Sequence, residues 1–373
     1  PYTVPPVIEA PDKFVIFASW LHKKTTEIYP QEKTEVFRGE LAELRKKIEG
    51  VFGIMDLEAY LEAVKEQLEA KLSIAEKLLE FPWNLYFVIF SESDWIFHRI
   101  YGEILKRSKL GRKADAIFSL MDEFIGKAVE LLSDEGLLMV VSDHGFAEHK
   151  RALNVNVLLK KLGYLKVSES VRGRVINKIL RMLPSRIKAS LKSRALTVLS
   201  SIRLQDRAFT MPIDYRNSMA FMQTLCNIYL NPLLKEDEKK RIADEIVHEL
   251  ETYRDLLGGI MRREELYSGP YVREAPEIVV FPGELTISAR MVSDKVVDEG
   301  LWYSHSLYGI FIAYGREVVS REHHVVSSFD VGATALFYLG CPLPSTCDGK
   351  PLKDIFSPTI ASREVLLRNY ASK

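Results

Sequence analysis

Two Asp–His combinations stand out in the sequence as candidate metal ligands. Asp94 and His98 are four residues apart in SESDWIFHRIYG, a spacing that puts both side chains on one face of a helix. Asp143 and His144 are adjacent in VVSDHGF, and Gly145 permits a turn that can bring both side chains to one ion. Taken singly, the first pair also fits a surface hydrogen bond and the second an ordinary Asp–Gly turn.

A third candidate is His305, which precedes the apolar run YGIFIAYG (308–315). Ligands of open α/β sheets bind at the carboxyl ends of the strands, whereas His305 precedes the N-terminal end of this predicted strand. It therefore needs a loop excursion to join the other candidates. A ligand set of Asp and His suits a zinc or manganese ion. It differs from the cysteine ligands that hold a structural zinc.

Together the five side chains exceed what one catalytic ion with an open coordination position requires. They suit two divalent cations about 3.5–4 Å apart, an arrangement that clamps a phosphoryl or sulfuryl group during in-line displacement. His149, a few residues after the DHGF motif, is expected on the protein surface.

Apolar runs and helical spacing predict the elements that position these residues. NLYFVIFSE (84–92) and DEGLLMVVS (134–142) are near-continuous apolar runs, typical of strands buried on both faces of a parallel sheet. Helices are expected over 93–107 and 112–134, and two long amphipathic helices over 31–81. This order predicts an α/β fold with a mostly parallel central sheet flanked by helices.

Further elements are expected on both sides of this region. They are a strand within 13–19, a helix over 152–165, strand-like residues over 218–231, a helix over 235–257, strands at 276–281 and 308–315, and a helix over 329–340.

The domain organisation follows from length and composition. The chain has 373 residues, of which 47% are hydrophobic, enough for a large buried core. From Lys166 to Arg207 basic residues dominate, which fits a solvated helical insertion or a basic cap or membrane-surface helix that attracts an anionic substrate. We predict an α/β core formed by 1–165 and 285–373, with a basic helical and mixed cap-like insertion at 166–284.

Charge, cysteines and apolar runs narrow the class of protein. The formal net charge is +0, so overall charge implies neither an acidic nor a basic partner. The three cysteines form no CxxC pair, and an odd number is a poor disulfide framework, so a reducing, cytoplasmic setting is expected. The longest apolar runs are too short to span a bilayer, so no transmembrane segment is expected.

The ordered motifs resemble those of the alkaline phosphatase superfamily, and specifically its type I phosphodiesterase/nucleotide pyrophosphatase branch found in archaea and bacteria. VIFSESDWIFHRIYG resembles that family's strand followed by D-x-x-x-H, VVSDHGF its second Asp–His pair, and SHSLYGIFIAYG its late histidine with the following strand. The segment 330–356 is similar to its later helix, D-G turn and final helix. The resemblance covers 84–165 and 210–356.

The resemblance implies a role for each candidate. Asp94, His98 and His305 would bind one metal ion, and Asp143 and His144 would bind the second together with a further Asp. A Thr or Ser nucleophile would attack phosphorus and form a covalent phospho-enzyme that water reopens. The family's order of motifs places this nucleophile and the further Asp upstream of Pro1, so we expect the chain to be a fragment or a truncated relative.

The expected function is a metal-dependent hydrolase of phosphate esters, acting on phosphodiester or nucleotide pyrophosphate bonds with two divalent ions, zinc or manganese. Its partner would be a phosphorylated small molecule or nucleotide, without specific binding of nucleic acid. Two alternatives stay open. One is a phosphomonoesterase, phosphotransferase or phosphomutase of the same superfamily. The other is a non-catalytic truncated relative that serves as a binding or scaffold module.

Overall fold

The computed structural model describes residues 15–18, 26–29, 34–51, 53–82, 84–167, 213–223, 226–291, 293–319 and 325–369. The chain divides into two compact units, 1–136 and 137–373. The predicted core of 1–165 with 285–373, and the predicted insertion at 166–284, stay predictions. Most of the basic stretch 166–207 lies outside the described residues.

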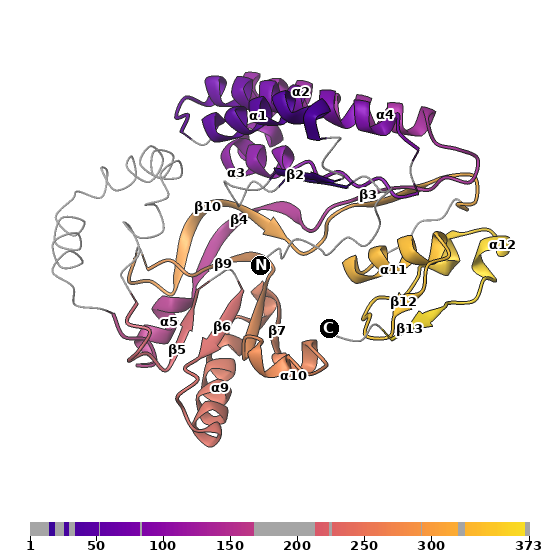
Figure 1. Ribbon diagram of the computed structural model, residues 1–373. Helices are drawn as coiled ribbons and strands as arrows, with labels where there is room; N and C mark the ends of the chain where they lie inside the picture. The colour runs from indigo at the N-terminus through magenta and orange to yellow at the C-terminus, as the bar shows by residue number, and fades with distance from the viewer. Residues whose placement is uncertain are drawn as a thin grey trace. The chain divides into compact units, whose positions relative to one another are not determined.

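The first unit is built mainly of helices (Figure 1). They are α1 (Thr34–Val51), α2 (Leu57–Leu79), α3 (Glu92–Leu105) and α4 (Lys109–Glu130), and a strand pair precedes them, β1 (Val15–Ala18) and β2 (Thr26–Tyr29). The predicted strand within 13–19 and the predicted helices in this region are confirmed.

The helices of the first unit share an apolar core. Leu61, Val64 and Leu68 recur along α2 at helical spacing and are at most 1% exposed, and they pack with Ile96 of α3 and Ile117 of α4. Burial of this stripe fixes which face of each helix points inward. The candidate metal ligands of α3, Asp94 and His98, must therefore lie on its other faces.

The segment 85–90 corrects one prediction. It was expected to be a strand buried on both faces, but it lies outside every strand that the structure describes. Tyr86, Val88 and Phe90 pack against the core of the first unit, whereas Leu85 and Phe87 are 58% and 80% exposed. Residues therefore alternate between one packed face and one open face, because the helical core contacts only one side of the segment.

The second unit holds the strands that carry the later motifs. One sheet has the order β10-β4-β9, formed by β10 (Val297–Ser306), β4 (Gly145–Asn154) and β9 (Leu285–Ser288). A separate pair joins β3 (Leu138–Val141) and β11 (Phe311–Tyr314), which confirms the two predicted strands around these residues. The long strand β4 was not predicted, and the helix expected from residue 152 begins only at α5 (Val155–Lys161).

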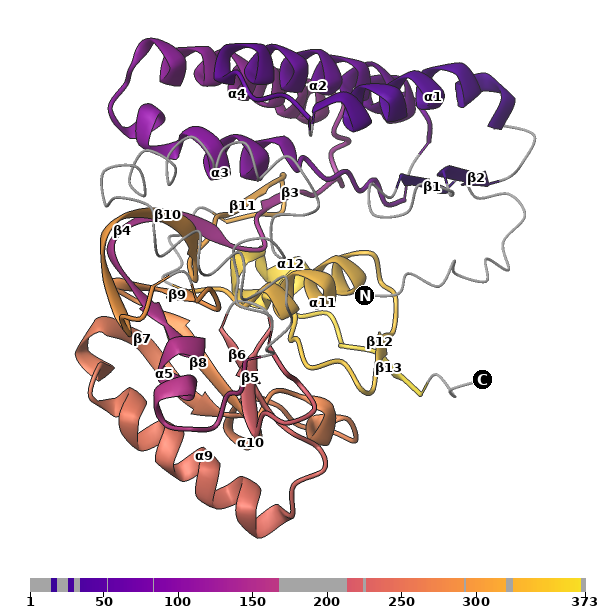
Figure 2. The same cartoon turned by 90° about the vertical axis from the view of Figure 1, so that its left-hand side faces the viewer.

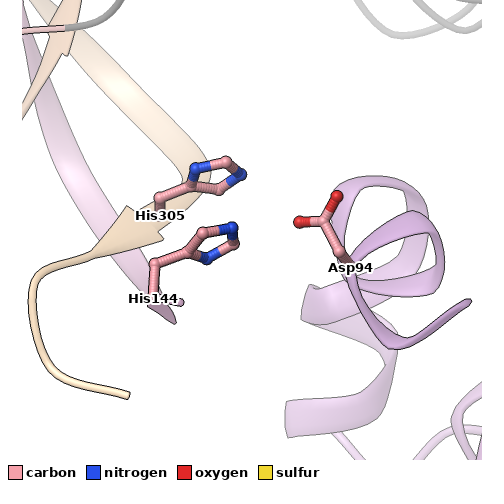
Figure 3. A group of neighbouring side chains, drawn as sticks. All are labelled: Asp94, His144 and His305. Carbon is pink, nitrogen blue, oxygen red and sulfur yellow. The ribbon is translucent and has the colours of Figure 1, made fainter. Parts of the chain in front are cut away.

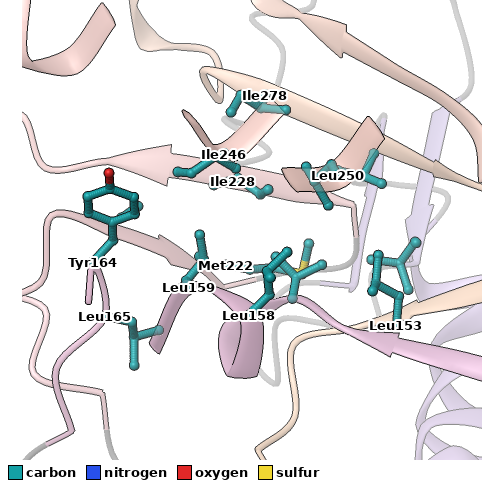
Figure 4. Close-up of a cluster of buried hydrophobic side chains, with 14 of the residues drawn as sticks. Leu153, Leu158, Leu159, Tyr164, Leu165, Met222, Ile228, Ile246, Leu250 and Ile278 are labelled. Atoms are coloured by element: carbon teal, nitrogen blue, oxygen red, sulfur yellow. The ribbon is translucent and has the colours of Figure 1, made fainter. Parts of the chain in front are cut away.

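A four-stranded antiparallel sheet with the order β5-β6-β8-β7 forms another part of the second unit. Its strands are β5 (Ala220–Met222), β6 (Asn227–Leu230), β8 (Ile278–Pro282) and β7 (Leu257–Arg262), and α9 (Glu236–Glu251) runs beside them in Figure 2. Side chains of α5, α9 and this sheet make one apolar cluster, drawn in Figure 4, that includes Leu159, Met222, Ile228, Ile246 and Leu250. The predicted strand-like region, helix and strand here are confirmed.

Short elements complete the second unit. These are α10 (Arg263–Leu266), α11 (Ser328–Tyr338), β12 (Leu343–Pro344), α12 (Pro358–Ala361) and β13 (Leu367–Arg368), with single 3-10 turns at Arg254–Leu256, Val272–Glu274 and Lys353–Ile355. The predicted helix over 329–340 is confirmed, and Gly340 follows it with φ of 68°, a conformation that ends many helices.

The α/β composition is confirmed, but a mostly parallel sheet is not found among the described strands. Six of their strand pairings are antiparallel, and only β4–β9 and β12–β13 are parallel. The prediction of a mostly parallel sheet was wrong because it assumed that strands next to each other in sequence, with a helix between them, also pair in the sheet. Instead β3 pairs with β11, which comes from far along the chain and runs the opposite way. Among the described helices, none combines the length and apolarity needed to cross a membrane.

Candidate metal centre

Helix α3 of the first unit presents the first Asp–His pair. Asp94 Oδ1 lies 3.3 Å from His98 Nε2, and the two side chains are 34% and 45% exposed. The i,i+4 spacing predicted this shared face, and the structure confirms it. Asp94 stands in the first turn of α3, where a carboxylate is also favoured by the partial positive charge of the helix N-terminus.

The second Asp–His pair occupies the turn between β3 and β4 in the second unit. Asp143 Oδ1 lies 3.6 Å from His144 Nε2, and the binding of one ion by these two side chains stays a prediction. His144 Nδ1 is 3.0 Å from the carbonyl oxygen of Gly145. Since a carbonyl can only accept, Nδ1 is the donor in this contact, and in the neutral ring Nε2 then carries the lone pair that a metal needs.

His305 is placed differently from its prediction. It belongs to the carboxyl end of β10, opposite Phe146 of β4, and not to a loop ahead of a strand. The expected loop excursion is therefore unnecessary, because strand pairing itself brings His305 to the turn that holds His144. The position of His305 in a strand was not predicted. Its segment resembles a loop in the sequence, because the strand that pairs with it lies far away along the chain.

The two histidines of the second unit form a close pair. The rings of His144 and His305 are stacked with centroids 3.7 Å apart and an interplanar angle of 12°. Figure 3 shows both rings extending to the same side of the chain segments that carry them, and it also draws Asp94 on its helix. Two imidazoles in this arrangement offer nitrogen atoms in a common direction, which suits a shared or adjacent cation.

Small residues allow the two histidine-bearing segments to approach closely. A Cβ on Gly145 would lie 1.9 Å from the carbonyl oxygen of Tyr308, and a Cβ on Gly309 would lie 2.1 Å from Ser142 Oγ. Ser142 Oγ accepts a hydrogen bond from the Ile310 amide at 2.8 Å, and the Ser142 amide donates to the Ile310 carbonyl at 3.1 Å. The sequence pointed to Gly145 as a turn residue but gave no signal for the roles of Ser142 and Gly309.

His149 is buried and not on the surface as expected. It lies in β4 opposite Trp302 and is 4% exposed, and its Nε2 has no hydrogen-bond partner among the described residues. The prediction was wrong because β4 was not anticipated, so the inward face of this segment could not be recognised.

A hollow of about 650 Å³ in the second unit adjoins Asp143. Its wall includes Ser142, Tyr308 and Ser327, and most of its remaining lining is apolar. No Lys or Arg is found among the described residues that line it. An anionic group bound there would have to be neutralised by something other than these side chains, and metal ions held by Asp and His can supply that positive charge.

Comparison with known proteins gives one match. A model of the family described as type I phosphodiesterase / nucleotide pyrophosphatase matches residues 14–290. Neither the curated proteins nor the solved structures contain a match to this chain.

Proposed function

Because this chain belongs to the type I phosphodiesterase / nucleotide pyrophosphatase family, we propose that it is a metal-dependent hydrolase of phosphodiester or nucleotide pyrophosphate bonds. The family itself points to phosphoester hydrolysis. The observation that carries the finer proposal is the stacked pair of His144 and His305, with the Asp143 carboxylate 3.6 Å from one of the two rings.

The donor set fits divalent cations. Asp94, His144 and His305 each offer one oxygen or nitrogen ligand atom, and His98 and Asp143 add two more. We propose that these five residues hold two ions, Asp94, His98 and His305 one of them and Asp143 and His144 the other. Mixed carboxylate and imidazole ligands favour zinc or manganese. Bound ions would supply positive charge to the phosphoryl group during displacement.

The residues of this chain then have distinct tasks. The hydrogen bond from His144 Nδ1 to the Gly145 carbonyl holds its ring so that Nε2 is available. Two hydrogen bonds between Ser142 and Ile310, one to the Ser142 hydroxyl and one between backbone groups, hold the turn that carries Asp143 in place. The covalent phospho-enzyme and its Thr or Ser nucleophile remain predictions of the resemblance.

A cytoplasmic setting and a nucleotide or other phosphorylated small molecule as substrate complete the proposal. Cys226, Cys341 and Cys347 are all free thiols, which fits a reducing compartment. The apolar lining beside Asp143 is compatible with an organic leaving group.

The test is elemental analysis paired with hydrolysis of bis(p-nitrophenyl) phosphate and p-nitrophenyl phosphate, made on this chain and on the chain extended upstream of Pro1. Because the resemblance places the nucleophile upstream of Pro1, we expect about two zinc or manganese ions per chain and faster turnover of the diester in the extended form. Faster turnover of the monoester by that form would favour the phosphomonoesterase alternative. Metal without turnover of either compound by either form would favour a non-catalytic binding module, and neither metal nor turnover in either form would refute the proposal.

A further inference from the structure

A buried ion pair lies two residues before Asp94. Lys71 Nζ of α2 contacts both carboxylate oxygens of Glu92, at 2.9 and 3.1 Å. The Glu92 side chain is 0% exposed and that of Lys71 is 21% exposed. The ammonium also lies 5.3 Å from the centre of the Phe90 ring. Glu92 is the first residue of α3, so the pair holds the start of this helix against α2.

Two further contacts hold the same part of α3. The Tyr60 hydroxyl donates to the Trp95 carbonyl at 3.0 Å, and Arg99 Nη1 donates to the Ile54 carbonyl at 2.8 Å. The Arg99 guanidinium also lies 4.0 Å from the centre of the Tyr60 ring. Burial raises the pKa of Tyr60, so its hydroxyl remains a neutral donor.

The part of α3 that carries the ligands is short. Ile100 has non-helical dihedrals (φ −137°, ψ 18°), so the helix is interrupted there. Asp94 and His98 therefore stand on about two turns of helix, and the direction of these turns is set by contacts at Glu92, Trp95 and Arg99. Residues two apart on a helix face different ways, so Glu92 can face the core while Asp94 faces outward.

Stability alone is a weak reason for such a pair. Removing two charges from water is costly, and well-packed apolar residues of similar volume often stabilise a fold as well or better. What an ion pair with two short contacts adds is a defined orientation of the groups that it joins. Here the group so oriented is the turn that carries a proposed metal ligand.

We propose that Lys71 and Glu92 are positioning residues for the metal bound by Asp94 and His98. Neither touches the metal. Their ion pair fixes the first turn of α3, so that the ligand atoms of Asp94 and His98 are already in place when the ion arrives. This inference rests on the proposed function and adds two residues to it for which the resemblance implies no role.

The test is Co²⁺ titration of the full chain, followed by visible absorption and by competition with a chromophoric chelator. We expect Lys71→Met to weaken the binding of one Co²⁺ ion about 10- to 100-fold, the range typical of residues that orient metal ligands. The visible spectrum of that ion should change as well. Lys71→Arg keeps the positive charge and should have the Co²⁺ affinity and spectrum of the wild type.

A double variant separates orientation from stability. Lys71→Met combined with Glu92→Met leaves no unpaired charge, so its midpoint of urea unfolding should stay near that of the wild type. Its Co²⁺ affinity should nevertheless fall as in Lys71→Met alone. Lys113→Met is the matched control, since it removes an exposed contact to Glu58 of 2.8 Å in the same unit and should leave Co²⁺ binding unchanged.

The outcomes distinguish this inference from the proposed function. A double variant that is folded and has wild-type affinity and spectrum would overturn the positioning role, while the proposed function stands. A wild-type chain that takes up no Co²⁺ would overturn the proposed function, and the positioning role with it.

Discussion

The imidazole rings of His144 and His305 lie nearly parallel with their centroids 3.7 Å apart, although His144 follows β3 and His305 is the last residue but one of β10. Antiparallel pairing of β10 with β4 sets this relationship, because His305 stands opposite Phe146, two residues after His144. The two side chains therefore act as one unit, and a change to either should affect what the other can bind.

We first predict that His144→Ala and His305→Ala each lower metal affinity strongly. Loss of a directly bound imidazole should cost at least the 10- to 100-fold typical of weaker, indirect changes. The measurement is metal content after dialysis, with affinity from chelator competition. His248→Ala, an exposed histidine of α9, is the matched control and should bind metal like the wild type. Equal metal content in all three variants would contradict the assignment.

We next predict opposite effects for two glycine-to-alanine changes. Gly145→Ala places a Cβ 1.9 Å from the Tyr308 carbonyl oxygen, so the β3–β4 turn must shift, and both thermal stability and metal affinity should fall. Gly126 is an exposed residue within α4, and a Cβ added there meets nothing within 4 Å. Gly126→Ala should therefore stabilise the chain by about 0.5–1 kcal/mol. Thermal unfolding and metal titration of both variants check this. A neutral Gly145→Ala would show that the turn has room that the structure does not display.

A third prediction concerns Gln67, which is 1% exposed in α2. Both polar atoms of its amide lack a hydrogen-bond partner among the described residues. An unsatisfied buried amide costs about 1–3 kcal/mol, so Gln67→Met should raise the free energy of unfolding by an amount of this order.

Urea unfolding measures this effect, and Gln67→Glu is the comparison, since it buries a charge and should lower stability. If Gln67→Met instead unfolds at lower urea than the wild type, the amide must have a partner that the described residues do not include.

A fourth prediction concerns alkaline pH. Burial raises the pKa of the Cys226 thiol from its ordinary value of 9.0 to about 11. Between these two values the unfolded chain loses the proton while the folded chain keeps it, so stability should fall as pH rises from 9 to 11. Cys226→Ala should flatten this decline in urea unfolding measured across the range.

The same burial should make Cys226 slow to react. Cys341 and Cys347 are exposed, so alkylation by iodoacetamide at pH 8 should modify them before Cys226, because the thiolate is the reactive form. Mass spectrometry of the labelled peptides gives the order, and Cys226 modified first would contradict both the burial and the raised pKa.

Local patterns were enough to predict much of the candidate site. The i,i+4 spacing of Asp94 and His98 and the glycine after His144 depend only on neighbours in sequence, and the structure agrees with both. The helices of the first unit were predictable for the same reason. Each shows an apolar stripe at helical spacing that packing then buries.

What could not be predicted depends on partners far away in sequence. The strand that carries His305 is defined by its pairing with β4, and the ion pair of Lys71 and Glu92 joins two helices. The open face of 85–90 was missed because an apolar run shows that burial is favourable, but not how many sides are contacted. Periodicity gives no information about any of these relationships.

That open face has a consequence for handling the protein. Leu85, Phe87 and Ile89 are all more than half exposed, and the segment 85–90 lies outside the strands that the structure describes. A run of exposed large apolar side chains of this kind favours self-association, because contact between two copies removes apolar surface from water. We therefore expect concentrated solutions to aggregate through this segment, and a single lysine in place of Phe87 to extend their shelf life.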